Sequence, residues 1–183
     1  FKLWKNYGYY AIAGAAAFVI GIAAIKGWQS YSLKIRMEQG EIFAAAQESA
    51  IKKHSDDALV ALQTLARDAS QGYAMLARFR TAALMGEKGD TSAAANIFAS
   101  LANDDSIDQV YQELAVVLGA LQELNNTEGS SKLIERAKSL AKSEGVWRHN
   151  AREIEALAAL AKGKNTVANG IFKELSITAG IPQ

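Results

Sequence analysis

The residues best suited to acid–base or metal chemistry are few in this sequence, and their spacing is unfavourable. The two histidines, His54 and His149, are far apart, and neither belongs to an H-E-x-x-H pattern. The acidic cluster Asp104, Asp105 and Asp108 lacks the D-x-D-x-D-G spacing and the distal glutamate of a calcium loop. Helix capping and the helix dipole explain this cluster better, because the dipole favours negative charge at a helix N-terminus. We therefore expect no bound metal.

Motifs for nucleophilic catalysis and phosphate binding are also missing from the sequence. There is no cysteine, which excludes disulfides, thiolate metal ligands and a cysteine nucleophile. Gly86-Glu87-Lys88-Gly89 is not a phosphate-binding loop, because no Gly-Lys-Ser/Thr follows it, and no G-x-S-x-G is present. We expect neither catalytic residues nor a cofactor. The alternative is an enzyme whose active site lies in an irregular pocket. Catalytic turnover that depends on His54 or His149 would favour this alternative.

Two pairs of arginines could bind a partner. Arg148 and Arg152 lie one helical turn apart after Trp147, so they could present two guanidinium groups to a carboxylate or phosphate beside an apolar anchor. The structural alternative, which we favour, is that Trp147 covers a hairpin interface, Arg152 pairs with Glu155 and Arg148 is solvated. The same two interpretations apply to a pair in an earlier helix, Arg78 and Arg80.

The elements that position these residues are predicted to be helices. The single proline is Pro182, and Ala, Leu, Glu, Lys and Gln are abundant, so little interrupts a helix. No stretch alternates apolar and polar residues as a half-buried strand does. The sequence predicts an all-α protein in which an N-terminal transmembrane helix precedes about four helical hairpins.

The predicted transmembrane helix has the length and the flanks of a membrane span. The 20 residues from Asn6 to Ile25 carry no charge, and a helix of that length covers ~30 Å, the thickness of a bilayer's hydrocarbon core. Aromatic residues, which favour membrane interfaces, cluster at both ends: Trp4, Tyr7, Tyr9, Tyr10, Trp28 and Tyr31. We assign residues 1–29 to a membrane anchor surrounded by lipid. A buried soluble helix and an uncleaved signal sequence are the alternatives.

Small residues form a stripe on this helix. Ala13, Ala17 and Gly21 recur every four residues on one face, which would let a second helix approach closely in lipid. We name them the membrane helix packing face. The alternative is that an Ala-rich helix produces such a stripe by chance.

A small-x3-large-x2-Leu pattern recurs in the rest of the chain, residues 30–183. Its three copies are Ala58-x3-Leu62-x2-Leu65, Ala94-x3-Phe98-x2-Leu101 and Ala168-x3-Phe172-x2-Leu175. They are 36 and 74 residues apart, which is one and two periods of about 37. The turns Lys88-Gly89-Asp90 and Lys162-Gly163-Lys164 precede two of the copies, as in tetratricopeptide (TPR) hairpins. The third unit, around Ser131 and Ile134, is degenerate. The pattern predicts a TPR-like array.

Polar residues mark the expected helix starts. Ser55 or Asp56 would cap a helix beginning at Asp57, and Asp90 or Thr91 would cap the helix that carries Phe98. Ser106 with Gln109 has the spacing of a capping box.

Charge separates the two parts of the chain. Five basic residues and no acidic ones lie up to Arg36, whereas the remainder carries 15 basic and 19 acidic residues. A net-acidic domain without basic blocks argues against nucleic acid, whose phosphates require clustered Lys and Arg. We therefore expect protein partners.

Four segments carry a family resemblance: Lys26-Gly27-Trp28, Tyr73-Ala74-Met75-Leu76-Ala77-Arg78, Glu87-Lys88-Gly89-Asp90 and Trp147-Arg148-His149-Asn150-Ala151-Arg152-Glu153. These segments, and the order of an N-terminal span followed by helical repeats, resemble the bacterial membrane-anchored TPR-like family related to the ancillary Sec-translocon subunit YfgM. The resemblance implies a single-pass protein of the bacterial inner membrane, with its N-terminus in the cytoplasm and its repeats in the periplasm. It also implies a non-enzymatic helper in a chaperone network for protein translocation.

The partners that the resemblance implies are the Sec translocon, a membrane-anchored prolyl isomerase and secretory chains. A structural accessory subunit of another inner-membrane complex is the alternative. Charge alone does not orient the span, since Lys2 and Lys5 precede it while Lys26, Lys34 and Arg36 follow it. The family's short cytoplasmic tail and a final helix after Pro182 are not in the sequence, so we expect a portion of a longer protein.

Overall fold

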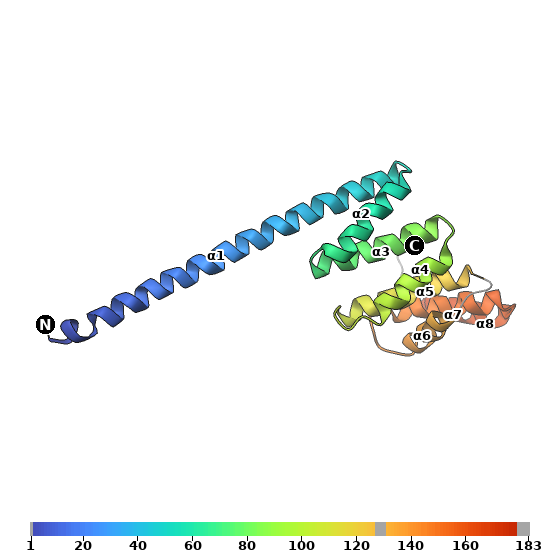
Figure 1. Cartoon of the computed structure of the whole chain (residues 1–183). Helices are drawn as coiled ribbons and strands as arrows, with labels where there is room; N and C mark the ends of the chain where they lie inside the picture. The colour runs from blue at the N-terminus through green and yellow to red at the C-terminus, as the bar shows by residue number, and fades with distance from the viewer. Residues whose placement is uncertain (1, 127–130, 179–183) are drawn as a thin grey trace. The chain divides into compact units, whose positions relative to one another are not determined.

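The computed structural model describes the backbone of residues 2–126 and 131–178 and the side chains of residues 18–126 and 131–177. Within these ranges the chain forms eight helices and no strand (Figure 1). They are α1 (Lys2–Ile51), α2 (Ser55–Asp68), α3 (Gln71–Glu87), α4 (Thr91–Ala102), α5 (Gln109–Leu124), α6 (Lys132–Leu140), α7 (Arg148–Ala161) and α8 (Asn165–Thr178). The all-α prediction is confirmed.

The first helix, α1, has 50 residues and contributes to two compact units, residues 1–42 and 43–183. Over the residues that the structure describes, none of the helices is both long and apolar enough to cross a membrane. Most of the predicted span, including Ala13 and Ala17, lies outside the described side chains. Gly21 is described, and a Cβ built on it would meet nothing within 4 Å.

Residues 43–183 form an array of paired helices. From α2 onward each helix packs against the next, and α5 also contacts α7. The pairs are the end of α1 with α2, α3 with α4, α5 with α6, and α7 with α8, and we refer to α2, α4, α6 and α8 as the second helices. Packing between neighbours is what stacked hairpins produce, because each hairpin buries an apolar face on the next one.

Two apolar clusters hold the array together. The smaller one joins the end of α1 to α2 and α3, and its buried members are Ala46, Ala58, Leu62, Leu65, Ala77 and Leu84. The larger one extends from α3 to α7 around Phe98, Leu133 and Ile154, each at most 2% exposed. The Phe79 and Phe98 rings lie 6.0 Å apart at 56° within it. Burying each large side chain contributes roughly 1.5 to 3 kcal/mol.

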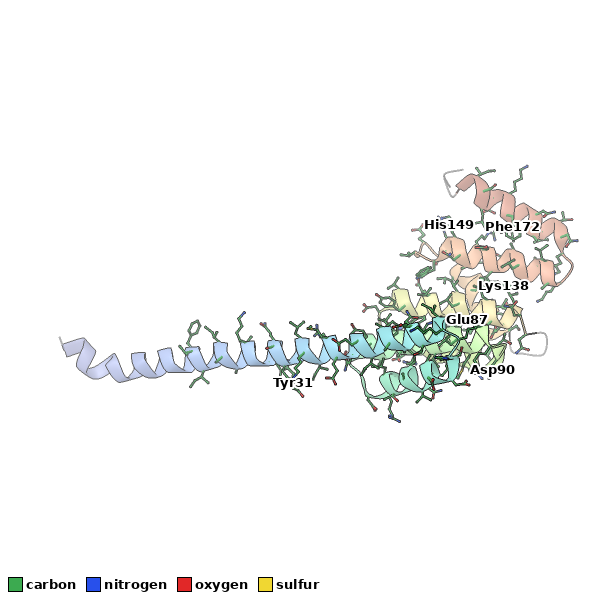
Figure 2. The ribbon with its side chains drawn as sticks, turned by 90° about the horizontal axis from the view of Figure 1, so that it is seen from above. Tyr31, Glu87, Asp90, Lys138, His149 and Phe172 are labelled. Carbon is green, nitrogen blue, oxygen red and sulfur yellow. The ribbon has the colours of Figure 1, made fainter. Side chains whose placement is uncertain are left out.

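The repeated sequence pattern predicts burial well in α2 and α4 and less well in α8. Phe98 is 2% exposed, whereas Phe172 (Figure 2) and Leu175 are only half-buried. The pattern shared with Phe98 and Leu101 predicts that Phe172 and Leu175 also lie inside, and this prediction is wrong because both are only partly covered. α8 packs mainly against α7, so one side of α8 is less covered than the corresponding side of α4. Ile171, at 6% exposure, is the large buried residue of α8.

Both predicted turns within hairpins are confirmed. Gly89 and Gly163 have φ values of +90° and +71°, a region that glycine adopts without steric cost. Each turn is closed by the same hydrogen bond, from Asp90 N–H to the Met85 carbonyl and from Lys164 N–H to the Ala159 carbonyl, both at 2.9 Å.

Lys53 occupies the corresponding position after α1. Its φ is +64°, and the following His54 N–H donates to the Ser49 carbonyl at 2.9 Å. The first hairpin therefore uses the same turn without a glycine.

One predicted cap is confirmed and two are wrong. Asp90 Oδ1 accepts a hydrogen bond from Ala93 N–H at 3.0 Å. α2 begins at Ser55, so Ser55 and Asp56 lie inside the helix instead of before it.

The predicted capping box at Ser106 does not form. α5 begins one residue after Asp108, and Ser106 Oγ instead donates to Asp104 Oδ1 at 2.5 Å. The acidic side chain two residues earlier competes successfully for the serine hydroxyl.

Gly119 lies where α4, α5 and α6 approach closely. A Cβ built on Gly119 would lie 2.4 Å from Leu133 Cδ1 and 2.8 Å from Phe98 Cβ. Real Cβ atoms do not come this close, so the helices pack at this separation because residue 119 is glycine.

Candidate interaction surface

Arg78, on α3, connects its helix to the end of α4. Its Nη1 lies 2.5 Å from Asp104 Oδ2, and its Nη2 donates to Ser100 Oγ at 3.0 Å. Asp104 also accepts hydrogen bonds from the hydroxyl and the N–H of Ser106. These bonds from Ser106 and Arg78 lower the pKa of Asp104 to about 2, because they stabilise its charged form.

Arg80 makes its contact along its own helix. Its Nη1 donates to Glu87 Oε1 at 2.9 Å. Among the described residues, its buried Nε has no hydrogen-bond partner, and neither does the hydroxyl of Thr81. The two arginines of α3 therefore have separate surroundings.

The aromatic anchor at the start of α7 is part of the packing between hairpins. Trp147 Nε1 donates to the Val110 carbonyl at 2.7 Å, and its ring packs against the larger cluster. Arg152 donates to Glu155 Oε2 at 2.6 Å and to Glu174 Oε2 at 2.7 Å. The bond to Glu174, and then that to Glu155, raises the pKa of Arg152. For Trp147 and Arg152, these contacts agree with the structural alternative, in which Trp147 covers a hairpin interface and Arg152 pairs with Glu155.

Arg148 is half-buried, where we expected it to be solvated. Its Nη2 lies 3.3 Å from His149 Nε2. Arg148, His149 and Arg152 line one hollow of about 420 Å³ between the end of α6 and α8. The structure thus brings Arg148 and Arg152 together and places Arg78 and Arg80 elsewhere.

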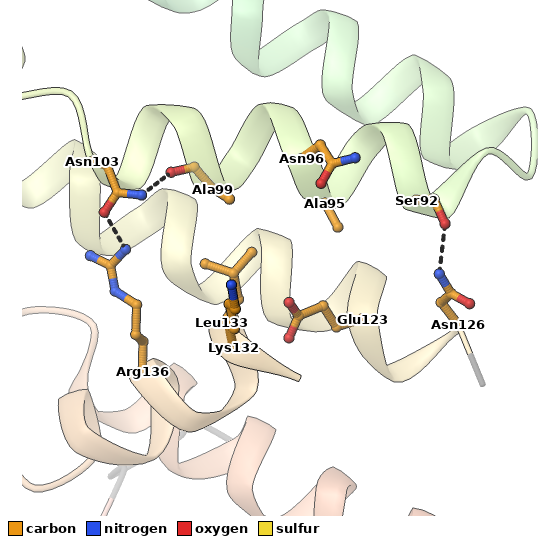
Figure 3. A pocket seen from close by; sticks show the side chains of 10 residues that line it. All are labelled: Ser92, Ala95, Asn96, Ala99, Asn103, Glu123, Asn126, Lys132, Leu133 and Arg136. Atoms are coloured by element: carbon orange, nitrogen blue, oxygen red, sulfur yellow. Dashed lines mark hydrogen bonds between the residues drawn. The ribbon is translucent and has the colours of Figure 1, made fainter. Parts of the chain in front are cut away.

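Two further hollows lie between second helices within the part of the chain that the structure describes. A hollow of about 450 Å³ is lined by α2, α3 and α4, and includes Arg78 and Thr81. A larger hollow of about 640 Å³ is lined by α4, the end of α5 and α6 (Figure 3). We call this one the α4–α6 hollow. Asn96 of α4 lines both, so the two hollows adjoin at that side chain.

Polar side chains sit at both ends of the α4–α6 hollow (Figure 3). At one end Arg136 donates to Asn103 Oδ1 at 2.9 Å and to the Ala102 carbonyl at 3.0 Å. At the other end Asn126 Nδ2 donates to Ser92 Oγ at 2.7 Å. These bonds connect α4 and its C-cap to α6 at one end of the hollow and to the segment just after α5 at the other.

Glu123 lines the same hollow and is a buried carboxylate, 7% exposed. Its Oε2 accepts a hydrogen bond from the Ile134 N–H at 3.0 Å. Ile134 lies in the first turn of α6, where backbone N–H groups have no partner within the helix. Glu123 therefore caps α6 from the end of α5.

No metal site is apparent within the described ranges, where no three His, Cys, Asp or Glu side chains are grouped to hold an ion. His149 contacts Arg148, and His54 is the residue before α2. The polar side chains that line the three hollows can form hydrogen bonds and ion pairs with another molecule.

Comparison with protein-family models matches residues 2–174 to the tetratricopeptide repeat-like domain. The chain belongs to this family. Comparisons with curated proteins and with solved structures found no match. The predicted TPR-like fold is confirmed, and the family match includes the whole of α1 and the array as far as residue 174. TPR-like repeats are in general non-catalytic modules that bind other proteins through extended surfaces, so this TPR-like chain has the architecture of an interaction protein.

Proposed function

We propose that this TPR-like protein is a non-enzymatic interaction protein anchored in the bacterial inner membrane. The observation that carries the proposal is the extent of the family match, which takes in α1 and the array together. The uncharged stretch from Asn6 to Ile25 supports the anchor, because its length suits a bilayer. Within that stretch the described side chains of Phe18, Val19 and Ile25 are 70%, 64% and 59% exposed.

We further propose that the N-terminus is cytoplasmic and that the repeats are periplasmic, as an ancillary factor of the Sec translocon and its chaperone network. The resemblance to the YfgM-related family supports this placement, and the absence of cysteine is compatible with an oxidising compartment. The partners proposed on the same ground are the translocon, a membrane-anchored prolyl isomerase and secretory chains.

Protease treatment of spheroplasts tests the orientation. We expect protease to digest the repeats while a cytoplasmic marker stays intact. Digestion only after lysis would reverse the orientation and end the proposal that the protein serves secreted chains.

A charge placed in α1 tests the anchor. Val19→Arg puts a cation near the middle of the proposed span, at a cost of about 2.5 kcal/mol or more. We expect this variant to be released from membranes by alkaline extraction, whereas Val60→Arg, at an exposed position of α2, should stay bound. Full retention of the Val19 variant would mean that the protein is not anchored by this stretch.

A second candidate function is a structural accessory subunit of another inner-membrane complex. The sequence feature that favours it is the face of small residues Ala13, Ala17 and Gly21, which would let a second helix approach closely in lipid. A photo-cross-linker at position 21 should capture one stoichiometric partner for a structural subunit and several variable partners for a chaperone-network factor. Val19, on the opposite side of the helix, is the matched control position.

A further inference from the structure

We propose that the α4–α6 hollow binds an extended peptide segment and that Arg136 pairs with an aspartate or glutamate side chain of that segment. The inference rests on the proposed function, because it names the surface and the partner chemistry of an interaction protein. It places the site between α4 and α6, next to the hollow lined by α2, α3 and α4.

The charge of Arg136 distinguishes this hollow from its neighbours. In the hollow lined by α2 and α4, Arg78 is matched by Asp104, and in the hollow beside α8, Arg152 is matched by Glu155 and Glu174. Arg136 donates only to the neutral oxygens of Asn103 and Ala102, and it forms no ion pair with any residue that the structure describes. Glu123, the carboxylate that lines this hollow, accepts from the Ile134 N–H, so Arg136 is left without a carboxylate partner among the described residues.

The partners of Arg78 and Arg152 are carboxylates of Asp and Glu side chains, so we expect Arg136 to bind the same class of group. A guanidinium takes a carboxylate through two parallel hydrogen bonds. The exposed side chain of Arg136 keeps N–H groups available beyond its two bonds, since a guanidinium has five. We therefore assign the acidic group of the ligand to this end of the hollow.

The rest of the hollow suits a polypeptide backbone. It extends along α4 from Ser92 to Asn103, which is roughly 16 Å at the rise of an α-helix and matches about five extended residues. Ala95 and Ala99 line it with small side chains, and Glu123 places a carboxylate in the middle, between the two polar ends (Figure 3). Small side chains let a backbone approach, and a carboxylate accepts from backbone N–H groups.

Asn96 places a side-chain amide without a described partner beside the proposed position of the peptide backbone. Its side chain is exposed, and within the described residues its amide has no hydrogen-bond partner. An asparagine amide both donates and accepts, so it can pair with a peptide N–H and C=O. Because Asn96 also lines the adjoining hollow, a longer segment could continue past it toward α2.

Fluorescence anisotropy with synthetic peptides and the full chain tests the site. The probe is a labelled peptide of alanine, serine and asparagine with one central glutamate and an amidated C-terminus. The first comparison peptide has glutamine in place of the glutamate, and the second has that glutamine and a free C-terminal carboxylate. We expect the glutamate peptide to bind about tenfold more tightly than the glutamine peptide, and high salt to reduce the difference.

Variants of the chain locate the binding. We expect Arg136→Gln to weaken binding of the glutamate peptide about tenfold and Arg136→Lys to restore part of it. Arg36→Gln, an equal change at an exposed position of α1, should have no effect. Asn96→Ala should weaken binding about threefold without lowering the melting temperature, because the amide makes no internal bond.

Equal binding of the glutamate and glutamine peptides, or unchanged binding by both the Arg136→Gln and Asn96→Ala variants, would overturn the inference. Tighter binding of the peptide with the free C-terminus than of the glutamate peptide would also overturn it. The site would then recognise a C-terminal carboxylate instead of an acidic side chain. The peptide-binding results and the test of the proposed function can fail independently of each other. Protection of the repeats in spheroplasts would reject the periplasmic role and leave the peptide result intact.

Discussion

The second helices α4 and α8 carry the same small-x3-large-x2-Leu pattern and have different surroundings. In α4, Phe98 and Leu101 are at most 2% exposed, because α3 and α5 both pack against this helix. In α8, Phe172 and Leu175 are half-buried. The pattern therefore specifies how two helices of a hairpin fit together, whereas burial of its large residues depends on the neighbouring hairpins.

The largest effect that we expect separates the two phenylalanines. Phe98→Ala should lower the free energy of unfolding by about 3 to 5 kcal/mol, because it opens a cavity in the larger cluster. Phe172→Ala should cost about 1 to 2 kcal/mol, since a half-buried side chain loses less contact with the protein. Urea denaturation of the full chain, monitored by circular dichroism, measures both losses. Equal losses would mean that α4 and α8 do not differ in the way described.

A pair of glycines tests the same comparison through the backbone. Gly119→Ala should destabilise the protein by about 1 to 3 kcal/mol, because the added methyl group collides with Leu133 and Phe98. Gly170→Ala, in α8, is the matched control, since its Cβ would meet nothing within 4 Å. It should stabilise the protein by about 0.5 to 1 kcal/mol through helix propensity. Stabilisation by both substitutions would contradict the close approach at Gly119.

The hydrogen bonds that Asp104 accepts from Ser106 and Arg78 should make part of the stability depend on pH. The pKa of Asp104 is lowered to about 2 in the folded chain, against about 3.9 in an unfolded one. A lowered carboxyl pKa stabilises the folded state above the unfolded value, and this contribution is lost as pH falls from about 4 to about 2.

The Arg78→Met variant isolates the part of this contribution that comes from Arg78, because the hydrogen bonds from Ser106 remain. Its free energy of unfolding at neutral pH should be about 1 kcal/mol lower than that of the unsubstituted chain, which is the usual contribution of a partly exposed ion pair. Its difference from the unsubstituted chain should shrink as the pH falls toward 2, and urea titrations at several pH values measure this. A difference that stays constant across this range would assign the loss to packing of the arginine side chain.

The smallest effect concerns the turn at Lys53, which uses a left-handed backbone where the later hairpins have Gly89 and Gly163. Lys53→Gly should raise the free energy of unfolding by about 0.5 to 1 kcal/mol, because it removes the steric cost of a side chain at positive φ. Gly89→Ala should cost about 1 kcal/mol for the converse reason. Thermal unfolding compares the two, and a loss of stability in both variants would show that the Lys53 side chain is favourable in its turn.

The helical array was predictable because local rules determine most of it. The apolar period and the glycines at positions 89 and 163 identified the hairpins and the turns inside them. The prediction failed at Ser106, where the hydroxyl binds Asp104 instead of capping α5. It also failed at Phe172, since the sequence period does not reveal how much of α8 its neighbours cover.

The candidate site was less predictable than the fold. Trp147 and Arg152 were recognised by residue type, and their structural contacts with Val110 and Glu174 cross hairpins. Asn96 and Arg136 were missed, because a single polar residue on a helix surface carries no period that marks it as part of a site. Their significance comes from the spacing of α4 and α6, which depends on packing around Gly119.

The position of α5 in the array has a consequence for the order in which its backbone amides become accessible to solvent. α5 packs against α4, α6 and α7, whereas α8 packs mainly against α7. Opening α5 to hydrogen exchange therefore requires three interfaces to break, while α8 can detach by losing one. Amide protons should exchange slowest in α5 and much faster in α8, so that the molecule frays from its last hairpin while the helices around the α4–α6 hollow stay closed.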